Sequence, residues 1–161
     1  MRNLEKNVTL RAAILGVMSG MRSVAGSATI ARRAVREPKG FEGTIFRLLT
    51  KRSMSGLATL GQVGEIVLDK LPILPARIAP LPLVGRAFYG GAAGAAAFAE
   101  ARRPVILGAL LGAGAAVASA HVFYRLRVGA SKGLHVPDPV VAIAEDGVVF
   151  ALERAAMRTY E

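Results

Sequence analysis

The chain has 161 residues, of which 53% are hydrophobic and 18 are glycine, and its formal net charge is +10. This apolar, glycine-rich composition is unlike that of a water-soluble domain and is typical of a single membrane domain over residues 1–161. The absence of cysteine excludes disulfides and thiolate metal sites. The basic residues stand in short clusters between apolar runs, so we expect anionic lipid headgroups and not nucleic acid as their counter-charge.

The first apolar segment spans residues 12–30 and contains Gly16, Gly20 and Arg22. Glycines four positions apart lie on one helix face, where the missing side chains let a second helix approach closely. An arginine at bilayer depth costs about 3 kcal/mol on insertion scales. We therefore expect Arg22 to pair with an acid, to snorkel to the membrane surface, or to face a wet cavity.

A basic loop over residues 32–52 follows, with seven lysines and arginines against two glutamates. The positive-inside rule places this loop on the cytoplasmic side. The second apolar segment, residues 53–74, carries Glu65 and Asp69 four positions apart on one helix face, and Lys70 follows directly. Four prolines between positions 72 and 82 then prevent a continuous helix.

The third and fourth apolar segments span residues 83–99 and 104–124. The fourth has no charged residue and is flanked by arginines. At about 1.5 Å rise per residue it is long enough to cross a bilayer, and it is the clearest transmembrane helix of the chain. These two segments hold further glycine pairs that we expect to pack helices together: Gly90 with Gly94, and Gly108 with Gly112.

The last apolar segment, residues 139–152, follows Asp138-Pro139, which is a favourable start for a helix. It carries Glu145 and Asp146 in an otherwise apolar stretch. We therefore predict an all-α, polytopic membrane helix bundle with four to five membrane-embedded helices.

Two stretches look alike: LGVMSG from Leu15 and LGALLG from Leu107. Each opens an apolar helix that leads into arginines, and each is followed by a helix with two acids. If the segment between the two units crosses the membrane once, the units have opposite orientations. Inverted repeats of this kind recur in transporters, with polar sites where the halves meet. An inverted repeat of two helix pairs is therefore one arrangement that the sequence favours.

Three motifs in the chain resemble those of a known family. They are Gly20-Met21-Arg22, the stretch Leu68-Asp69-Lys70-Leu71-Pro72, and Pro137-Asp138-Pro139 followed by Glu145-Asp146. In this order they resemble a family of small bacterial integral membrane proteins, domain of unknown function 4126. The resemblance covers nearly the whole chain except the basic loop. It implies a multi-pass protein of the inner membrane, and it offers no catalytic or binding residues to carry over.

Ionisable residues inside a membrane are energetically costly, so we expect those in this chain to have a functional or structural role. One hypothesis is a pathway for a proton, ion or small solute, lined by a polar cluster of Arg22, Glu65, Asp69, Lys70, Glu145 and Asp146. The alternative is that these residues pair as structural supports in an accessory subunit of a larger membrane complex. The expected partners are the bilayer itself and either further copies of the chain or other membrane subunits.

Nothing in the sequence indicates an enzyme. There is no Ser/His/Asp arrangement, metal-ligand spacing or phosphate-binding loop, so we predict no catalytic residue and no metal. His121 lies within residues 104–124 and has the chemistry of a haem ligand. Because such a histidine more often bonds a neighbouring helix, we expect no cofactor.

Overall fold

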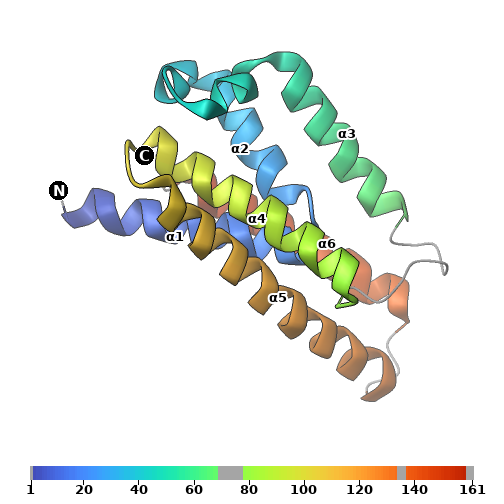
Figure 1. Ribbon diagram of the computed structural model, residues 1–161. Coiled ribbons are helices and arrows are strands. Elements are labelled where there is room, and N and C mark those ends of the chain that lie inside the picture. Colours follow the sequence, from blue (N-terminus) through green and yellow to red (C-terminus); the bar gives the residue numbers. More distant parts are fainter. Residues whose placement is uncertain (1, 69–77, 134–136, 159–161) are drawn as a thin grey trace.

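The computed structural model describes residues 2–68, 78–133 and 137–158. Within these ranges every regular element is a helix and there is no strand, which confirms the predicted all-α class (Figure 1). In chain order the elements are α1 (Arg2–Met21), α2 (Ala25–Arg36), the 3-10 helices η1 (Pro38–Phe41) and η2 (Ile45–Thr50), α3 (Arg52–Leu68), α4 (Pro80–Glu100), α5 (Val105–Gly133) and α6 (Asp138–Arg158).

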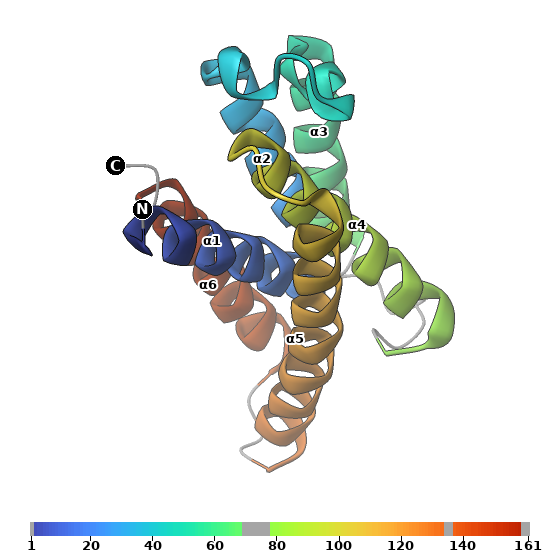
Figure 2. The same cartoon turned by 60° about the vertical axis from the view of Figure 1, so that its left-hand side comes forward.

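Three helices, α1, α4 and α5, form the centre of the bundle (Figure 2). Their contact is made by small residues, and it includes all six glycines expected to pack helices. A Cβ added at Gly90 would lie 2.7 Å from the carbonyl oxygen of Gly112, which is inside normal contact distance. Added Cβ atoms would likewise overlap backbone atoms of a neighbouring helix at Gly16, Gly20, Gly94, Gly108 and Gly112. Backbones this close require glycine, as the four-residue spacing predicts.

The glycine contacts also give the relative direction of the helices. On α4 and α5, Gly90 lies against Gly112 and Gly94 against Gly108, so these helices run antiparallel. On α1 and α5, Gly16 lies against Gly112 and the next glycine, Gly20, against Ala116, so these two run in the same general direction (Figure 1). An inverted repeat would need α1 and α5 to run in opposite directions. The inverted-repeat interpretation therefore does not fit this pair of helices.

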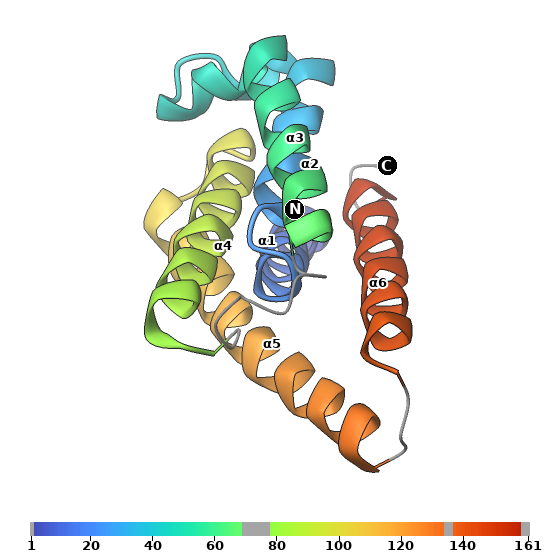
Figure 3. The same ribbon diagram turned by 90° about the vertical axis from the view of Figure 1, so that its right-hand side faces the viewer.

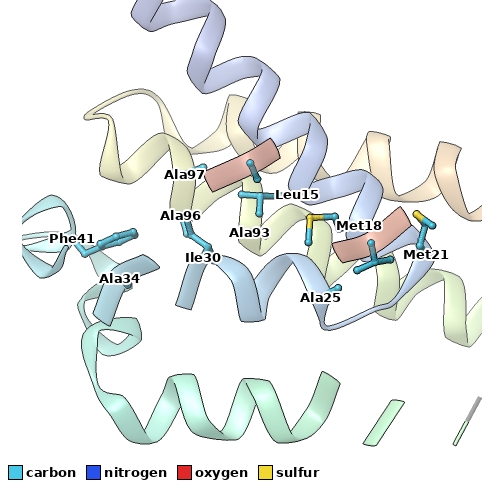
Figure 4. Close-up of a cluster of buried hydrophobic side chains, with 12 residues drawn as sticks. Leu15, Met18, Met21, Ala25, Ile30, Ala34, Phe41, Ala93, Ala96 and Ala97 are labelled. Carbon is cyan, nitrogen blue, oxygen red and sulfur yellow. The ribbon is translucent and has the colours of Figure 1, made fainter. Parts of the chain in front are cut away.

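A hydrophobic core joins α1, α2 and α4 (Figure 4). The large side chains come from α1 and α2, among them Leu15, Met18 and Ile30, and α4 contributes alanines. The labelled members that fill this interface are 2% exposed or less: Leu15, Met18, Met21, Ala25, Ile30, Ala93, Ala96 and Ala97. The small residues on α4 leave room for the larger side chains of α1 and α2 at this interface.

Several predicted boundaries need correction. The segment 12–30 is not one helix, because α1 ends at Met21 and α2 begins at Ala25. The basic loop 32–52 is partly helical, since α2 continues to Arg36 and both 3-10 helices follow. The charge-free segment 104–124 extends as α5 to Gly133. The end of segment 53–74 lies outside the described residues beyond Leu68.

By length and hydropathy, one helix in the described ranges could cross a membrane. It is Val105–Ser131, with a mean hydropathy of 1.9, and 28% of its most apolar window is buried. A shorter apolar helix covers Val8–Met21. By this criterion the predicted four to five spans are not supported. The other long helices have a lower mean hydropathy because they contain a larger share of glycine and charged residues.

Candidate functional site

The break between α1 and α2 places two helix ends inside the bundle. The amide of Arg22 still donates to the carbonyl of Met18 at 2.8 Å, and the amide of Ala25 donates to the carbonyl of Arg22 at 3.0 Å. Helix ends leave backbone carbonyls and amides without intrahelical partners. Away from bulk water these groups need other partners, and both sets find them in side chains of distant helices.

The C-terminal end of α1 is capped by Arg86 of α4. Its Nη1 donates to the carbonyl oxygens of Gly20, at 2.5 Å, and Met21, at 3.2 Å. Arg86 is only 6% exposed. A buried cation at this end satisfies free carbonyls and complements the negative end of the helix dipole. Arg86 was not among the predicted site residues, although it is the only charged residue in segment 83–99, and that isolation was an available signal.

The N-terminal end of α2 is capped by Glu65 of α3. Its Oε1 accepts a hydrogen bond from the amide of Ser23 at 2.7 Å, and its Oε2 accepts one from the amide of Val24 at 3.2 Å. A carboxylate at this end complements the positive end of the helix dipole, and its hydrogen bonds are charge-assisted. The two helix ends at the break thus hold side chains of opposite charge.

Arg22 lies in the break itself and is 2% exposed. Its Nε donates to Oδ1 of Asp146 on α6 at 2.9 Å, and its Nη2 lies 2.6 Å from the same oxygen. Arg22 was expected to pair with an acid, to snorkel to the membrane surface, or to face a wet cavity. In the structure it pairs with an acid. This contact joins α6 to the break, so five helices meet there: α1, α2, α3, α4 and α6.

The predicted polar cluster is therefore brought together in part. Arg22, Glu65 and Asp146 meet at the break. Glu145 is buried at 6% exposure but belongs to a separate pair, because its Oε2 lies 3.5 Å from Nη1 of Arg127 on α5. Asp69 and Lys70 lie outside the described residues.

A second polar network, which sequence reasoning missed, joins α2, α3 and α6. The Nη2 of Arg32 donates to Oε1 of Glu153 at 2.7 Å, and its Nη1 donates to Oε1 of the buried Gln62 at 3.1 Å. The third network centres on Glu100 at the end of α4, whose carboxylate lies 3.4 Å from Arg11 and 3.2 Å from Arg33. Arginines of the first two helices thus pair with acids of later ones.

His121 hydrogen-bonds within its own helix, with Nδ1 2.9 Å from the carbonyl oxygen of Val117. Among the residues that the structure describes, no three His, Asp or Glu side chains gather in a way that could hold a metal ion.

Comparison of the chain with protein-family models, with curated proteins and with solved structures found no match. The resemblance to domain of unknown function 4126 therefore stays a prediction.

Proposed function

We propose that this chain is a multi-pass integral membrane protein whose broken first helix holds a polar site for a proton, ion or small solute. The membrane location is supported first by α5. Only 28% of its apolar window is buried, which favours a lipid-facing helix over the buried core helix of a soluble protein. It also lies far from the N-terminus, where a signal sequence would be.

The surfaces of four helices support the same location. Contiguous exposed apolar surface beyond a few hundred Å² is unusual on a soluble monomer. Here α3, α4, α5 and α6 each expose large apolar side chains that are more than half accessible: Leu57, Leu60, Val63, Leu81, Val84, Phe88, Ile106, Leu107, Leu110, Val140, Ile143 and Phe150. Lipid contact with all four helices accounts for this pattern.

The charge distribution supports an orientation. Arg102, in the turn between α4 and α5, donates to the carbonyl of Glu42 in the basic loop over residues 32–52 at 3.1 Å. The Arg33–Glu100 pair also ties the end of α4 to α2. The arginines of this turn and those of the basic loop therefore lie at the same end of the molecule. The positive-inside rule assigns this end to the cytoplasmic side.

The broken helix carries the proposal of a solute site. Discontinuous helices whose ends meet at mid-bundle are typical of transporters, where the free backbone groups bind ions or substrates. Irregular backbone at membrane depth is tolerated where protein or a water-filled cavity surrounds it. In this protein Arg86 binds the carbonyl oxygens that a bound cation would compete for, and Glu65 binds the amides that a bound anion would compete for. A small ion or proton that displaced or neutralised Glu65 would free the amides of Ser23 and Val24.

Solute flux through liposomes that contain the purified protein tests this proposal. Glu65→Gln removes the carboxylate charge at the end of α2 with little change in size, so we expect it to abolish or strongly change any flux of protons or small ions. The matched control is Glu37→Gln, because Glu37 lies on the surface with its side chain 58% exposed. Equal effects of the two substitutions would contradict a pathway at the break.

An accessory subunit of a larger membrane complex is the second candidate, and the position of α3 favours it. This helix contacts α2 and η2 and stands apart from the central helices (Figure 1). Leu57 and Leu60 on it are 64% and 70% exposed. A partner subunit could cover this face. Gentle extraction from the native membrane, followed by native electrophoresis and mass spectrometry, distinguishes a homo-oligomer from a complex with fixed partners.

A further inference from the structure

A basic cavity of about 820 Å³ lies between α2 and the second half of α6. Its lining includes Arg32, Arg36, Arg154, Arg158 and Glu153. Glu153 pairs with Arg32 at 2.7 Å, and the other three arginines are exposed and form no ion pair within the described part of the chain. The cavity therefore has an excess of three positive charges, four arginines less one glutamate, and it suits an anion.

The wall of this cavity on α6 is apolar at one end and cationic at the other. Phe150 lines it and is 56% exposed. Gly147 leaves space beside Phe150, because a Cβ added there would meet no atom within 4 Å. Ile143, one helical turn before Gly147, is 63% exposed. Residues three or four positions apart share a helix face, so a single face of α6 leads from Ile143 through Phe150 to Arg154.

The cationic end of the cavity lies at the same end of the molecule as the basic loop. The C-terminal half of α6 points toward the end with η1 and η2 (Figure 3). Arg36 is the last residue of α2 and lies within the basic loop over residues 32–52. In the proposed orientation this is the level of the cytoplasmic headgroups, where anionic lipids are found.

We infer that this cavity binds the phosphate-bearing headgroup of an anionic phospholipid, with an acyl chain along the Ile143–Phe150 face of α6. Guanidinium groups bind phosphate oxygens with paired, charge-assisted hydrogen bonds. A free phosphate ion has the same charge chemistry but would leave the adjoining apolar face unused. The inference rests on the membrane location in the proposed function and is independent of solute passage.

Thermal unfolding of the full chain in a neutral detergent tests the inference. The protein is titrated with short-chain phosphatidylglycerol, with phosphatidylcholine of the same chain length, or with inorganic phosphate. A ligand that binds the folded state raises the melting temperature. We expect phosphatidylglycerol to raise it at concentrations at which the other two have little effect.

Two double variants locate the binding. In R154Q/R158Q the half-maximal phosphatidylglycerol concentration should rise about 25-fold, because each arginine near an anionic headgroup contributes roughly a factor of five. The control R47Q/R52Q removes the same charge from exposed positions outside the cavity, and its titration should match that of the unsubstituted protein. If the first variant does not fold, R36Q on α2 should weaken binding about fivefold.

Equal stabilisation by phosphatidylcholine would overturn the inference, and so would an unchanged titration in R154Q/R158Q or, in its place, R36Q. Equal stabilisation by inorganic phosphate would mean a free-anion site and would overturn the assignment to lipid. Recovery of the protein in the aqueous fraction without detergent would instead refute the membrane location before any lipid is added. Absence of any proton or small-ion flux through liposomes that contain the unsubstituted protein would refute the pathway and leave the lipid result standing.

Discussion

The glycine contact at the centre of the bundle gives a sharp prediction, for which α5 supplies its own control. A Cβ added at Gly112 would lie 2.9 Å from the carbonyl carbon of Gly90 and 3.2 Å from Cα of Gly94, and closer still to the Gly90 oxygen. All of these are backbone atoms, so no side-chain rotation relieves the overlap. A Cβ at Gly114, two residues along the same helix, would meet no atom within 4 Å.

Gly112→Ala should therefore destabilise the protein while Gly114→Ala stabilises it. Overpacking costs about 3 kcal/mol at the upper end of its usual range. Alanine recovers about 1 kcal/mol of helix propensity at either position. The net changes in the free energy of unfolding are a loss of about 2 kcal/mol at Gly112 and a gain of about 1 kcal/mol at Gly114.

Thermal unfolding in detergent measures both changes. At roughly 2 to 4 °C per kcal/mol for a chain of this size, Gly112→Ala should lower the melting temperature by about 4 to 8 °C, and Gly114→Ala should raise it by about 2 to 4 °C. Shifts of the same sign and size for the two variants would refute the close helix contact.

Three further predictions test the helix break by unfolding experiments. Arg86→Met should lower the melting temperature more than Arg52→Met, since only Arg86 caps buried carbonyls, and a charge-assisted hydrogen bond contributes about 2 kcal/mol; equal shifts would contradict the cap. Arg22→Met should lower the free energy of unfolding by about 3 kcal/mol, and adding Asp146→Leu should recover much of that loss. Simple additivity of the two changes in a denaturant double-mutant cycle would argue against the ion pair. Gly26→Ala should lower the free energy of unfolding by about 2 kcal/mol, because its Cβ would overlap backbone and side-chain atoms of α1. An unchanged melting temperature would count against the close contact of α2 with α1.

The helix class and the packing faces could be predicted because both depend on local spacing. Glycines four positions apart define a helix face that a neighbour can approach, wherever that neighbour comes from. The identity of the neighbour does not follow from the spacing. Gly16 could have packed on any small-residue face, and its contact with Gly112 follows from the arrangement of three helices.

The helix break could not be predicted, because no proline and no helix-ending motif lies at residues 22–24. The break depends on side chains that are distant in sequence. Arg86 is 65 positions from Met21, and Glu65 is 42 positions from Ser23. Sequence reasoning did predict that Arg22 needs a partner, because a buried guanidinium is costly, but several acids qualified. The fold selects Asp146, and it directs the neighbouring Glu145 to Arg127 instead.

Single-cysteine labelling tests the central claim, membrane embedding of several helices, most directly. The chain has no cysteine of its own, so each introduced thiol is unique. Leu60, Phe88, Leu110 and Ile143 lie on four different helices and are 70%, 68%, 65% and 63% exposed. Arg103, in the turn before α5, is the exposed control position.

The reagent is a water-soluble maleimide, applied to membranes opened by freezing and thawing so that both faces are accessible. If lipid covers the four helices, cysteines at the four apolar positions should resist labelling while the one at Arg103 reacts. Reaction at all four positions as fast as at the control would mean that water covers these faces, and would contradict the membrane account.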